Sequence, residues 1–183
     1  CEYLTEKNKD FTSKSEAVVL NLLPELGEIF SDKRVKVKVK VKEERSGDGD
    51  IEDLIRKATN NDVKAQVKLA ERYSKGIGVE KNDEMAFEWY HRAAKQGNET
   101  AQTNLGFMYR KGYVVKKNDE MAFEWYHRAA KQGNETAQTN LGFMYKTGIG
   151  VEKNDTLAFE WWEKAAKQGN SIAQYNLGIM YRN

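Results

Sequence analysis

The chain has 183 residues, of which 39% are apolar and 32% are charged, so it can build a packed core although it is hydrophilic on average. Thirty Lys and Arg residues against 28 Asp and Glu leave a formal net charge of +2, which excludes a whole-molecule field for nucleic acid or for an acidic surface. A single cysteine excludes an internal disulfide and no apolar run reaches the length of a membrane helix, so we expect a protein of a reducing compartment such as the cytoplasm.

Residues 1–45 form an N-terminal extension whose composition differs from that of the remaining chain. It begins at Cys1 without an initiator methionine or the features of a signal peptide, so we interpret the chain as a fragment. Residues 16–30 contain apolar runs on both sides of Pro24, which predicts a short broken helix. Valine and lysine then alternate strictly over residues 35–42, a period that places them on opposite faces of a strand. No second strand is visible in the sequence to pair with it.

The segment of residues 33–45 carries seven basic and two acidic side chains. We interpret it as a charged, solvated linker. The alternatives are pairing between chains, addition to the edge of a partner's sheet, and tethering to an anionic surface such as a membrane or nucleic acid. The interleaved valines offer no platform on which bases could stack, which argues against nucleic acid. The sequence SGDGD at residues 46–50 predicts a turn that caps the first helix of a second region, residues 46–183.

Internal repetition dominates residues 46–183. Residues 81–109 and 117–145 are identical over all 29 positions at an offset of 36, and residues 153–181 are a diverged third copy at the same offset. Fainter pieces of the pattern precede them at residues 51–58 and 65–73. We therefore expect an array with a partial first unit and about three further units, the last of which is truncated.

The apolar spacing within each copy is helical, and two helices are predicted per unit. In the first copy one helix is apolar on most sides, with Asp83 placed to cap its start and Gly97 to end it. A second helix opens near Glu99, and its Gly106 is small enough for a neighbouring aromatic ring to approach the backbone. The expected core face of this second helix consists of Ala101, Leu105, Met108 and Tyr109.

A single helix pair of this kind buries too little apolar surface to offset the entropy of ordering its 36 residues. Stacked neighbours must complete its core. The sequence therefore predicts an all-α solenoid of helix pairs.

The repeated pattern resembles the Sel1-like repeat family, a relative of the tetratricopeptide repeat, over about residues 50–183. The resemblance implies a right-handed α-solenoid of antiparallel helix pairs, and proteins that act as adaptors or scaffolds in signalling and quality-control assemblies. At Tyr113 and Val114 the chain departs from the isoleucine and glycine of the other loops, so we expect a less tight loop there. The residues that carry the resemblance in one unit are Ala101, Leu105, Gly106, Tyr109, Gly112, Val115, Asp119, Ala122, Trp125, Tyr126, Ala129, Ala130 and Gly133.

In a tetratricopeptide-like register the first helix of each pair lines a concave groove. Phe107, Phe143 and Ile179 then form an apolar ladder flanked by basic residues. These residues either pack against adjacent repeats or anchor a protein or peptide with apolar and acidic segments, which is the function we expect. The positions not used by the core are Thr100, Thr103, Phe107, Arg110 and Lys111, then Thr136, Thr139, Phe143, Lys146 and Thr147, and finally Ile172, Tyr175, Ile179 and Arg182.

The array also contains a recurring asparagine, and its repeat pattern ends without a cap. Asn104, Asn140 and Asn176 recur in mid-helix, where asparagine is unfavourable, so we expect hydrogen bonds to the neighbouring repeat or to a bound peptide. The pattern stops at Asn183 without a polar capping helix, which leaves the last face available for self-association or for a continuing chain.

Candidate catalytic and metal-binding residues are few. His91 and His127 occupy equivalent positions that neighbouring repeats hold about 10 Å apart, too far to share one metal ion, so we interpret them as partly exposed helix-surface residues. Glu88 and Arg92 have the spacing of a favourable pair on one helix. The sequence contains no nucleophile motif, phosphate loop or dinucleotide fingerprint. We therefore expect a non-catalytic protein without a cofactor.

Overall fold

The computed structural model describes residues 48–182, and the regular structure in this part of the chain is helical. The helix and strand predicted for residues 16–42 lie outside the described residues. The first described helix begins at Asp48, inside the segment that we predicted as a turn. The helices are α2 (Asp48–Thr59), α3 (Val63–Lys75), α4 (Asp83–Lys95), α5 (Glu99–Lys111), α6 (Asp119–Lys131), α7 (Glu135–Thr147), α8 (Asp155–Lys167) and α9 (Ser171–Met180). None of these helices combines the length and the hydrophobicity that a bilayer-spanning helix needs.

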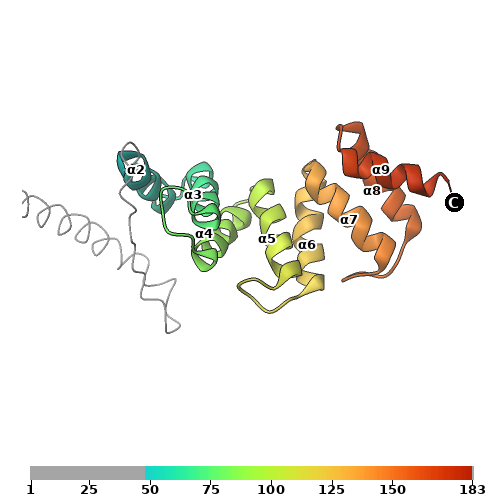
Figure 1. Cartoon of the computed structure of the whole chain (residues 1–183), viewed down its shortest axis with the longest axis horizontal. Helices are drawn as coiled ribbons and strands as arrows, with labels where there is room; N and C mark the ends of the chain where they lie inside the picture. Colours follow the sequence, from blue (N-terminus) through green and yellow to red (C-terminus); the bar gives the residue numbers. More distant parts are fainter. Residues whose placement is uncertain (1–47, 183) are drawn as a thin grey trace, which may run out of the picture. The chain divides into compact units, whose positions relative to one another are not determined.

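Successive helices stand side by side and form stacked pairs (Figure 1). Packing is most extensive between α3 and α4, between α5 and α6, and between α7 and α8. Contacts of α4 with α5 and of α6 with α7 join one pair to the next. Short loops connect the helices, so neighbours along the chain run antiparallel. The predicted all-α solenoid of helix pairs is confirmed.

Asparagine caps the helices from α4 to α9, whereas Asp62 caps α3. Asn82 has an extended backbone, and its side-chain oxygen accepts a hydrogen bond from the Met85 N–H at 2.8 Å. The prediction of Asp83 as the cap was therefore wrong by one residue, because Asp83 is already helical. An aspartate in the first turn is still favourable, since its charge opposes the positive end of the helix dipole. The equivalent caps of the other helices are Asn98, Asn118, Asn134, Asn154 and Asn170.

Two glycines accept aromatic rings directly on a helix backbone, as the sequence predicted for Gly106. A Cβ atom built on Gly106 would lie 2.8 Å from Cδ1 of Tyr126. One built on Gly142 would lie 2.4 Å from Cδ1 of Trp162. The ring in each case belongs to the second helix of the same pair, so these contacts set how closely the two helices approach.

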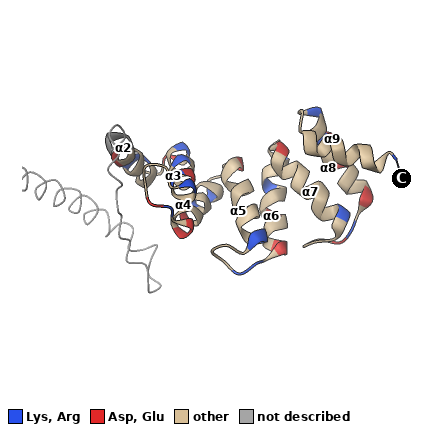
Figure 2. Cartoon of the chain, in the orientation of Figure 1, with Lys and Arg blue, Asp and Glu red and all other residues tan. Residues whose placement is uncertain are grey.

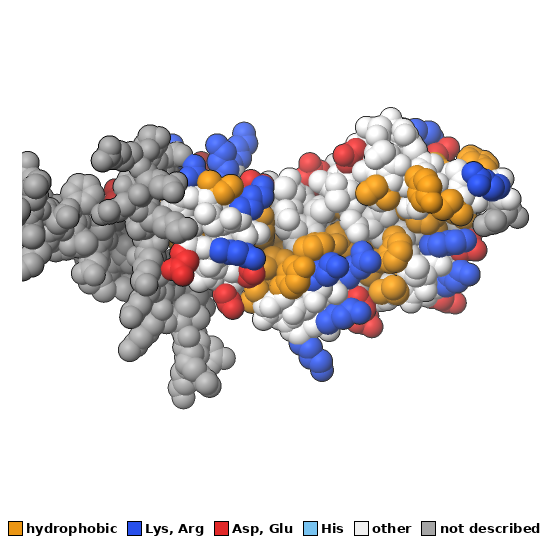
Figure 3. All heavy atoms as spheres, viewed as in Figure 1, with side chains coloured by type: hydrophobic (Ala, Val, Ile, Leu, Met, Phe, Trp, Pro, Cys, Tyr) orange, Lys and Arg blue, Asp and Glu red, His pale blue; other side chains and the backbone are white. Residues whose placement is uncertain are grey.

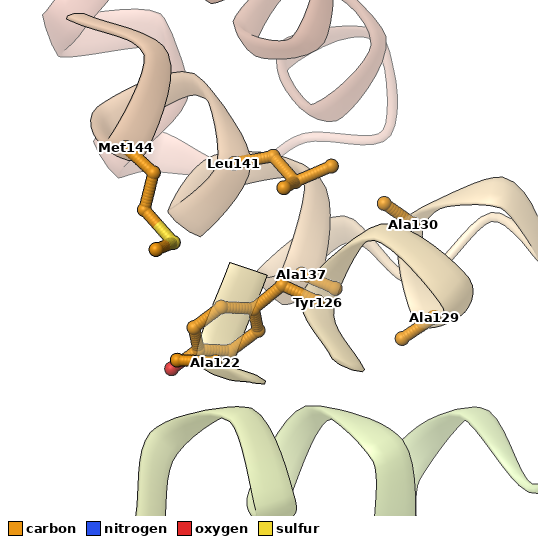
Figure 4. Packing of buried hydrophobic residues seen from close by; sticks show 7 residues of the cluster. All are labelled: Ala122, Tyr126, Ala129, Ala130, Ala137, Leu141 and Met144. Carbon is orange, nitrogen blue, oxygen red and sulfur yellow. The ribbon is translucent and has the colours of Figure 1, made fainter. Parts of the chain in front are cut away.

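A hydrophobic core between α6 and α7, at the boundary of two repeats, is built from one large ring, two flexible side chains and several alanines (Figure 4). Tyr126 is 1% exposed, and Leu141 and Met144 are fully buried beside it. Burial raises the pKa of the Tyr126 hydroxyl to about 12, although the nearby positive charge of Arg110 acts in the opposite direction. The alanines of the cluster are Ala122, Ala129, Ala130 and Ala137.

Buried glutamines join the helices across repeat boundaries. Gln102 of α5 donates its side-chain N–H to the Ala94 carbonyl of α4 at 3.2 Å, and its side-chain oxygen accepts from Gln132 at the end of α6 at 2.8 Å. Gln66 and Gln138 make the same two bonds in their repeats. Because the bonds recur with nearly unchanged lengths, α3, α5 and α7 are related by one repeated step. Residues 36 apart therefore occupy equivalent positions on these helices.

The loop between α5 and α6 differs from the other long loops in its backbone conformation, and the less tight loop expected there stays a prediction. Gly150 in the α7–α8 loop has a φ of +68° and lies so close to α6 that an added Cβ atom would meet the Asp119 carbonyl oxygen at 2.3 Å. Val114 stands at the equivalent position of the α5–α6 loop, and Asn61 is the one non-glycine residue with positive φ in the described part of the chain. Val114 therefore takes another backbone conformation, and the preceding Tyr113 is 62% exposed.

A candidate partner-binding surface

The predicted binding residues lie along the first helices of the pairs. We call the non-core residues of α5, α7 and α9, together with Tyr113, the α5–α9 surface. Along α5 and α7 the charged residues are confined to the helix ends, whereas charges are dense on α3 and α4 (Figure 2). Figure 3 shows hydrophobic side chains gathered in separate patches over the middle and the C-terminal part of the array, with Lys and Arg between them.

Phe107 is the exposed aromatic residue of α5. It is 42% exposed, and its ring contacts the ring of Tyr113 edge to face with a centroid separation of 5.8 Å. The Lys111 ammonium lies 5.7 Å from the centre of the Phe107 ring, within the range of a cation–π interaction. Two aromatic rings and a positive charge thus form one exposed patch at the C-terminal end of α5.

Phe143, the equivalent residue of α7, is half-buried. Its ring packs against the core cluster of α8 and α9, and the Arg110 guanidinium lies 4.7 Å from the ring centre. Arg110 also donates a hydrogen bond to the side-chain oxygen of Asn140 at 3.2 Å. Arg110, predicted as a reader of negative charge, therefore also holds α5 against α7 and covers Phe143.

One cause of the difference between the two phenylalanines lies in the preceding repeat, since the stretches around them, residues 99–109 and 135–145, are identical. Arg110 reaches Phe143 from the helix before it. The position equivalent to Arg110 in α3 is Ser74, whose side chain is too short to cover Phe107 in the same way. Phe107 is consequently the more accessible anchor.

The C-terminal helix α9 exposes half of its apolar residues. Ile172 is 61% exposed, Tyr175 71% and Ile179 43%, and Arg182 is exposed beyond them. An added Cβ atom on Gly178 would meet nothing within 4 Å, whereas the equivalent Gly106 and Gly142 receive aromatic rings. Self-association through this face stays a prediction.

The remaining predicted residues are engaged within the array to different extents. The Thr103 hydroxyl donates to the Glu99 carbonyl at 2.9 Å, and Lys146 pairs with Asp155 at 3.3 Å. Thr139 is only 8% exposed, because Trp162 packs beside it and donates its indole N–H to the Thr139 carbonyl at 3.0 Å. A buried side chain cannot contact a partner, so we omit Thr139 from the binding surface.

The asparagine ladder has both local and inter-repeat bonds. Asn104 and Asn140 each donate to the carbonyl four residues earlier, at 2.9 and 2.8 Å. This back-bonding gives each asparagine amide a hydrogen-bond partner within its own helix. The bond from Arg110 to Asn140 is a link to the neighbouring repeat of the kind that the sequence predicted.

The two histidines lie among aromatic rings of adjacent repeats. His91 stacks on Phe87 with a centroid separation of 6.0 Å and contacts Trp125 of the next repeat at 6.3 Å. His127 has the equivalent neighbours, Phe123 and Trp161. Partial burial lowers the pKa of both imidazoles, and Lys95 and Lys131 on the same helices lower it further. Among residues 48–182, no three ligating side chains are grouped closely enough to hold a metal ion.

We expect the array to lose stability as the pH falls below about 6.5, the ordinary histidine pKa. The folded-state pKa values of the two imidazoles are depressed, so just below pH 6.5 the unfolded chain binds more protons than the folded one, and unfolding is favoured. Thermal unfolding followed by circular dichroism at pH 7.5 and 5.0 tests this. The decrease in melting temperature should be smaller in a His91→Gln/His127→Gln variant, and an equal decrease would contradict the prediction.

The recurring arginines of α4 and α6 make solvated contacts, and an ion pair at the predicted spacing is found on α6. Glu124 lies 3.8 Å from Arg128, the predicted spacing of four residues, and both side chains are exposed. The guanidinium groups of Arg92 and Arg128 also lie over Trp89 and Trp125, at 4.9 and 4.8 Å from the ring centres.

Sequence reasoning missed two contributors to this side of the array. Tyr113 was read as a change in loop geometry, although an aromatic residue replacing isoleucine beside an exposed phenylalanine could have indicated a shared patch. The candidate binding residues also do not include the lysines of α3, because the apolar ladder begins at α5. Their spacing of four residues, at Lys64 and Lys68, was the available indication.

Comparisons with known proteins agree with this architecture. The sequence model of the Sel1 repeat matches residues 63–98, 100–134, 136–170 and 171–183. A solved Sel1 repeat protein from Oxalobacter formigenes is 46% identical, with a TM-score of 0.66 over 70% of this chain and 97% of that one. A protective antigen of uropathogenic Escherichia coli with an SLR fold is 30% identical, with a TM-score of 0.71 over 94% of this chain and 36% of that one.

A more distant relative has the same fold. Helicobacter pylori cysteine rich protein B is 26% identical, with a TM-score of 0.56 over 72% of this chain and all of that one. No curated protein matches the sequence. Proteins with these repeats are generally non-catalytic scaffolds for protein interactions. The match along four consecutive segments shows that the chain belongs to the Sel1 repeat family.

Proposed function

We propose that this chain is a non-catalytic scaffold that binds a segment of a partner protein on the α5–α9 surface, with Phe107 as the main anchor. The observation that carries the proposal is the exposed pair of Phe107 and Tyr113 with Lys111 beside it. Aromatic residues dominate the energetics of protein interfaces because they bury a large area with little loss of side-chain entropy.

The chemistry of the surface suggests what the partner segment contains. An apolar side chain would pack on the Phe107 and Tyr113 rings, and a second one on the exposed residues of α9. Acidic residues beside the first anchor would meet Lys111 and the outer edge of Arg110. A segment with alternating apolar and acidic residues therefore fits better than a uniformly charged one.

Selection from a library of displayed random peptides tests the proposal. We expect the enriched peptides to contain aromatic or aliphatic residues next to Asp or Glu. Phe107→Glu should weaken their binding at least about tenfold, the usual effect of losing a central aromatic contact. Thr156→Glu is the matched control, because it adds the same charge at an exposed position of α8. Equal binding to both variants would contradict the proposal, provided that their circular dichroism spectra agree.

A further inference from the structure

A hollow of about 470 Å³ lies against α2 and α3, at the N-terminal end of the described array. Its volume is within the range of sites that bind small ligands or peptide side chains. Cationic residues are the largest group in its lining, namely Lys57, Lys64, Lys68, Arg72 and Lys75. We call this site the basic hollow.

Two of the three acidic residues that line the basic hollow are already engaged. Asp53 pairs with Arg56 and Lys57. Asp62 accepts the Ala65 N–H at 3.0 Å as the cap of α3. The third acid is Glu71, while Lys64, Lys68 and Lys75 are exposed and form no ion pair within the described residues. Positive charge therefore remains uncompensated there.

The lysines of α3 are a departure from the repeat pattern. At positions related by the repeated step of 36 residues, Lys64 corresponds to Thr100 and Thr136, and Lys68 corresponds to Asn104 and Asn140. Like charges four residues apart on one helix repel each other, and the α3 stripe continues to Arg72. The core of the repeat does not require these charges, since α5 and α7 fold with neutral residues at the same positions.

Residues 36 apart along the chain also relate the basic hollow to the proposed anchors. Glu71 of α3, Phe107 of α5, Phe143 of α7 and Ile179 of α9 occupy equivalent positions. The exposed side of these helices thus changes from cationic at α3 to aromatic at α5 and to apolar at α9. We take one repeat step, from α3 to α5, as about 10 Å, which corresponds to about three residues of an extended peptide.

We propose that the basic hollow is a second subsite of the same binding surface and receives an acidic stretch of the partner segment. The inference rests on the proposed function, and it predicts a bipartite ligand. Several Asp or Glu residues lie over α3, and an aromatic or aliphatic residue about three positions away packs on Phe107. Exposed lysines attract carboxylates as mobile point charges, so this part of the binding is sensitive to salt.

Two synthetic fluorescein-labelled peptides separate the contributions of the two subsites. One carries four glutamates, a three-residue Gly-Ser-Gly spacer and Phe-Leu, and the other has glutamine in place of each glutamate. Fluorescence anisotropy measures both at 50 and 300 mM NaCl. We expect Lys64→Glu/Lys68→Glu to weaken binding of the acidic peptide at least tenfold at 50 mM NaCl and to leave the neutral peptide within twofold.

The control variant is Lys95→Glu/Lys131→Glu, which makes the same change in charge at exposed positions of α4 and α6. Equal weakening by the two double variants, or no weakening by either, overturns the subsite. If Phe107→Glu abolishes binding but Lys64→Glu/Lys68→Glu does not, the proposed function stands without the subsite. If the lysine variant abolishes binding and Phe107→Glu does not, the proposed function fails instead.

A final comparison tests the chemical class of the ligand. Vesicles of phosphatidylcholine with phosphatidylserine and single-stranded polyuridylate replace the peptide in the same assay. Binding of either one as tight as that of the acidic peptide, lost in Lys64→Glu/Lys68→Glu, would overturn the assignment to an acidic protein segment.

Discussion

Gly142→Ala is expected to destabilise the array by about 2–4 kcal/mol, at or above the upper end of the usual cost of overpacking a core. The added Cβ atom would lie 2.4 Å from Cδ1 and Nε1 of Trp162, so the indole ring must move. It cannot move freely, because it is 4% exposed and its N–H donates to the Thr139 carbonyl at 3.0 Å. Thermal and urea unfolding followed by circular dichroism measure the change.

Gly178→Ala is the matched control for this prediction. Gly178 occupies the equivalent position of α9, where an added Cβ atom meets nothing within 4 Å. Alanine forms helix more readily than glycine by about 0.5–1 kcal/mol, so this variant should be slightly more stable than the unchanged protein. A loss of stability in Gly142→Ala and a gain in Gly178→Ala would show that the loss is caused by the contact with the Trp162 ring. A similar loss at both positions would contradict that explanation.

The helix pairs and their close approach at glycine could be predicted from the sequence, because they depend on spacing within one repeat. Apolar periodicity located the helices, and a small residue at Gly106 indicated a neighbouring ring, which proved to be Tyr126. The cap was misplaced by one residue because aspartate and asparagine are both good caps. Backbone geometry at Asn82, which the sequence does not display, decided between them.

The accessibility of the binding residues could not be predicted, because it depends on contacts with residues of other helices. Phe107 and Phe143 lie in identical stretches of sequence, yet Arg110 covers only Phe143. Thr139 resembles Thr103 in sequence position, but Trp162 encloses it where the preceding repeat has the smaller Tyr126. The accessibility of Thr139 is therefore set by the second helix of its own pair, and that of Phe143 is set in part by the preceding repeat.

These contacts between repeats also bear on how binding specificity can arise in a duplicated array. The copies share their core, so substitutions at one boundary change the surface without changing the fold. Three such differences are found here. Tyr113 adds a second ring to the patch at Phe107, Arg110 covers the ring of Phe143, and the lysines of α3 line the basic hollow. A partner segment would then be recognised by the order in which these different surfaces follow one another along the array.

The glutamine bonds that fix the step between repeats were missed from the sequence, and they lead to a second large expected effect. Gln138→Ala should destabilise the array by about 2 kcal/mol, because it removes two buried hydrogen bonds and leaves a small cavity. Gln138 is 5% exposed, donates to the Ala130 carbonyl at 3.2 Å and accepts from Gln168 at 2.8 Å. These bonds join α6, α7 and α8, which belong to two repeats.

Gln174→Ala provides the comparison, since Gln174 is the equivalent residue of α9. Its side chain is exposed and donates one bond of 3.3 Å to the Ala166 carbonyl, so its loss should cost less than about 0.5 kcal/mol. Urea unfolding of both variants measures the difference, and equal stability would show that the buried bonds contribute nothing beyond their exposed counterpart. Gln138→Ala changes no exposed anchor residue. If it also weakens peptide binding, the glutamine bonds are needed to hold the binding residues of α5 and α7 at the spacing that the partner recognises.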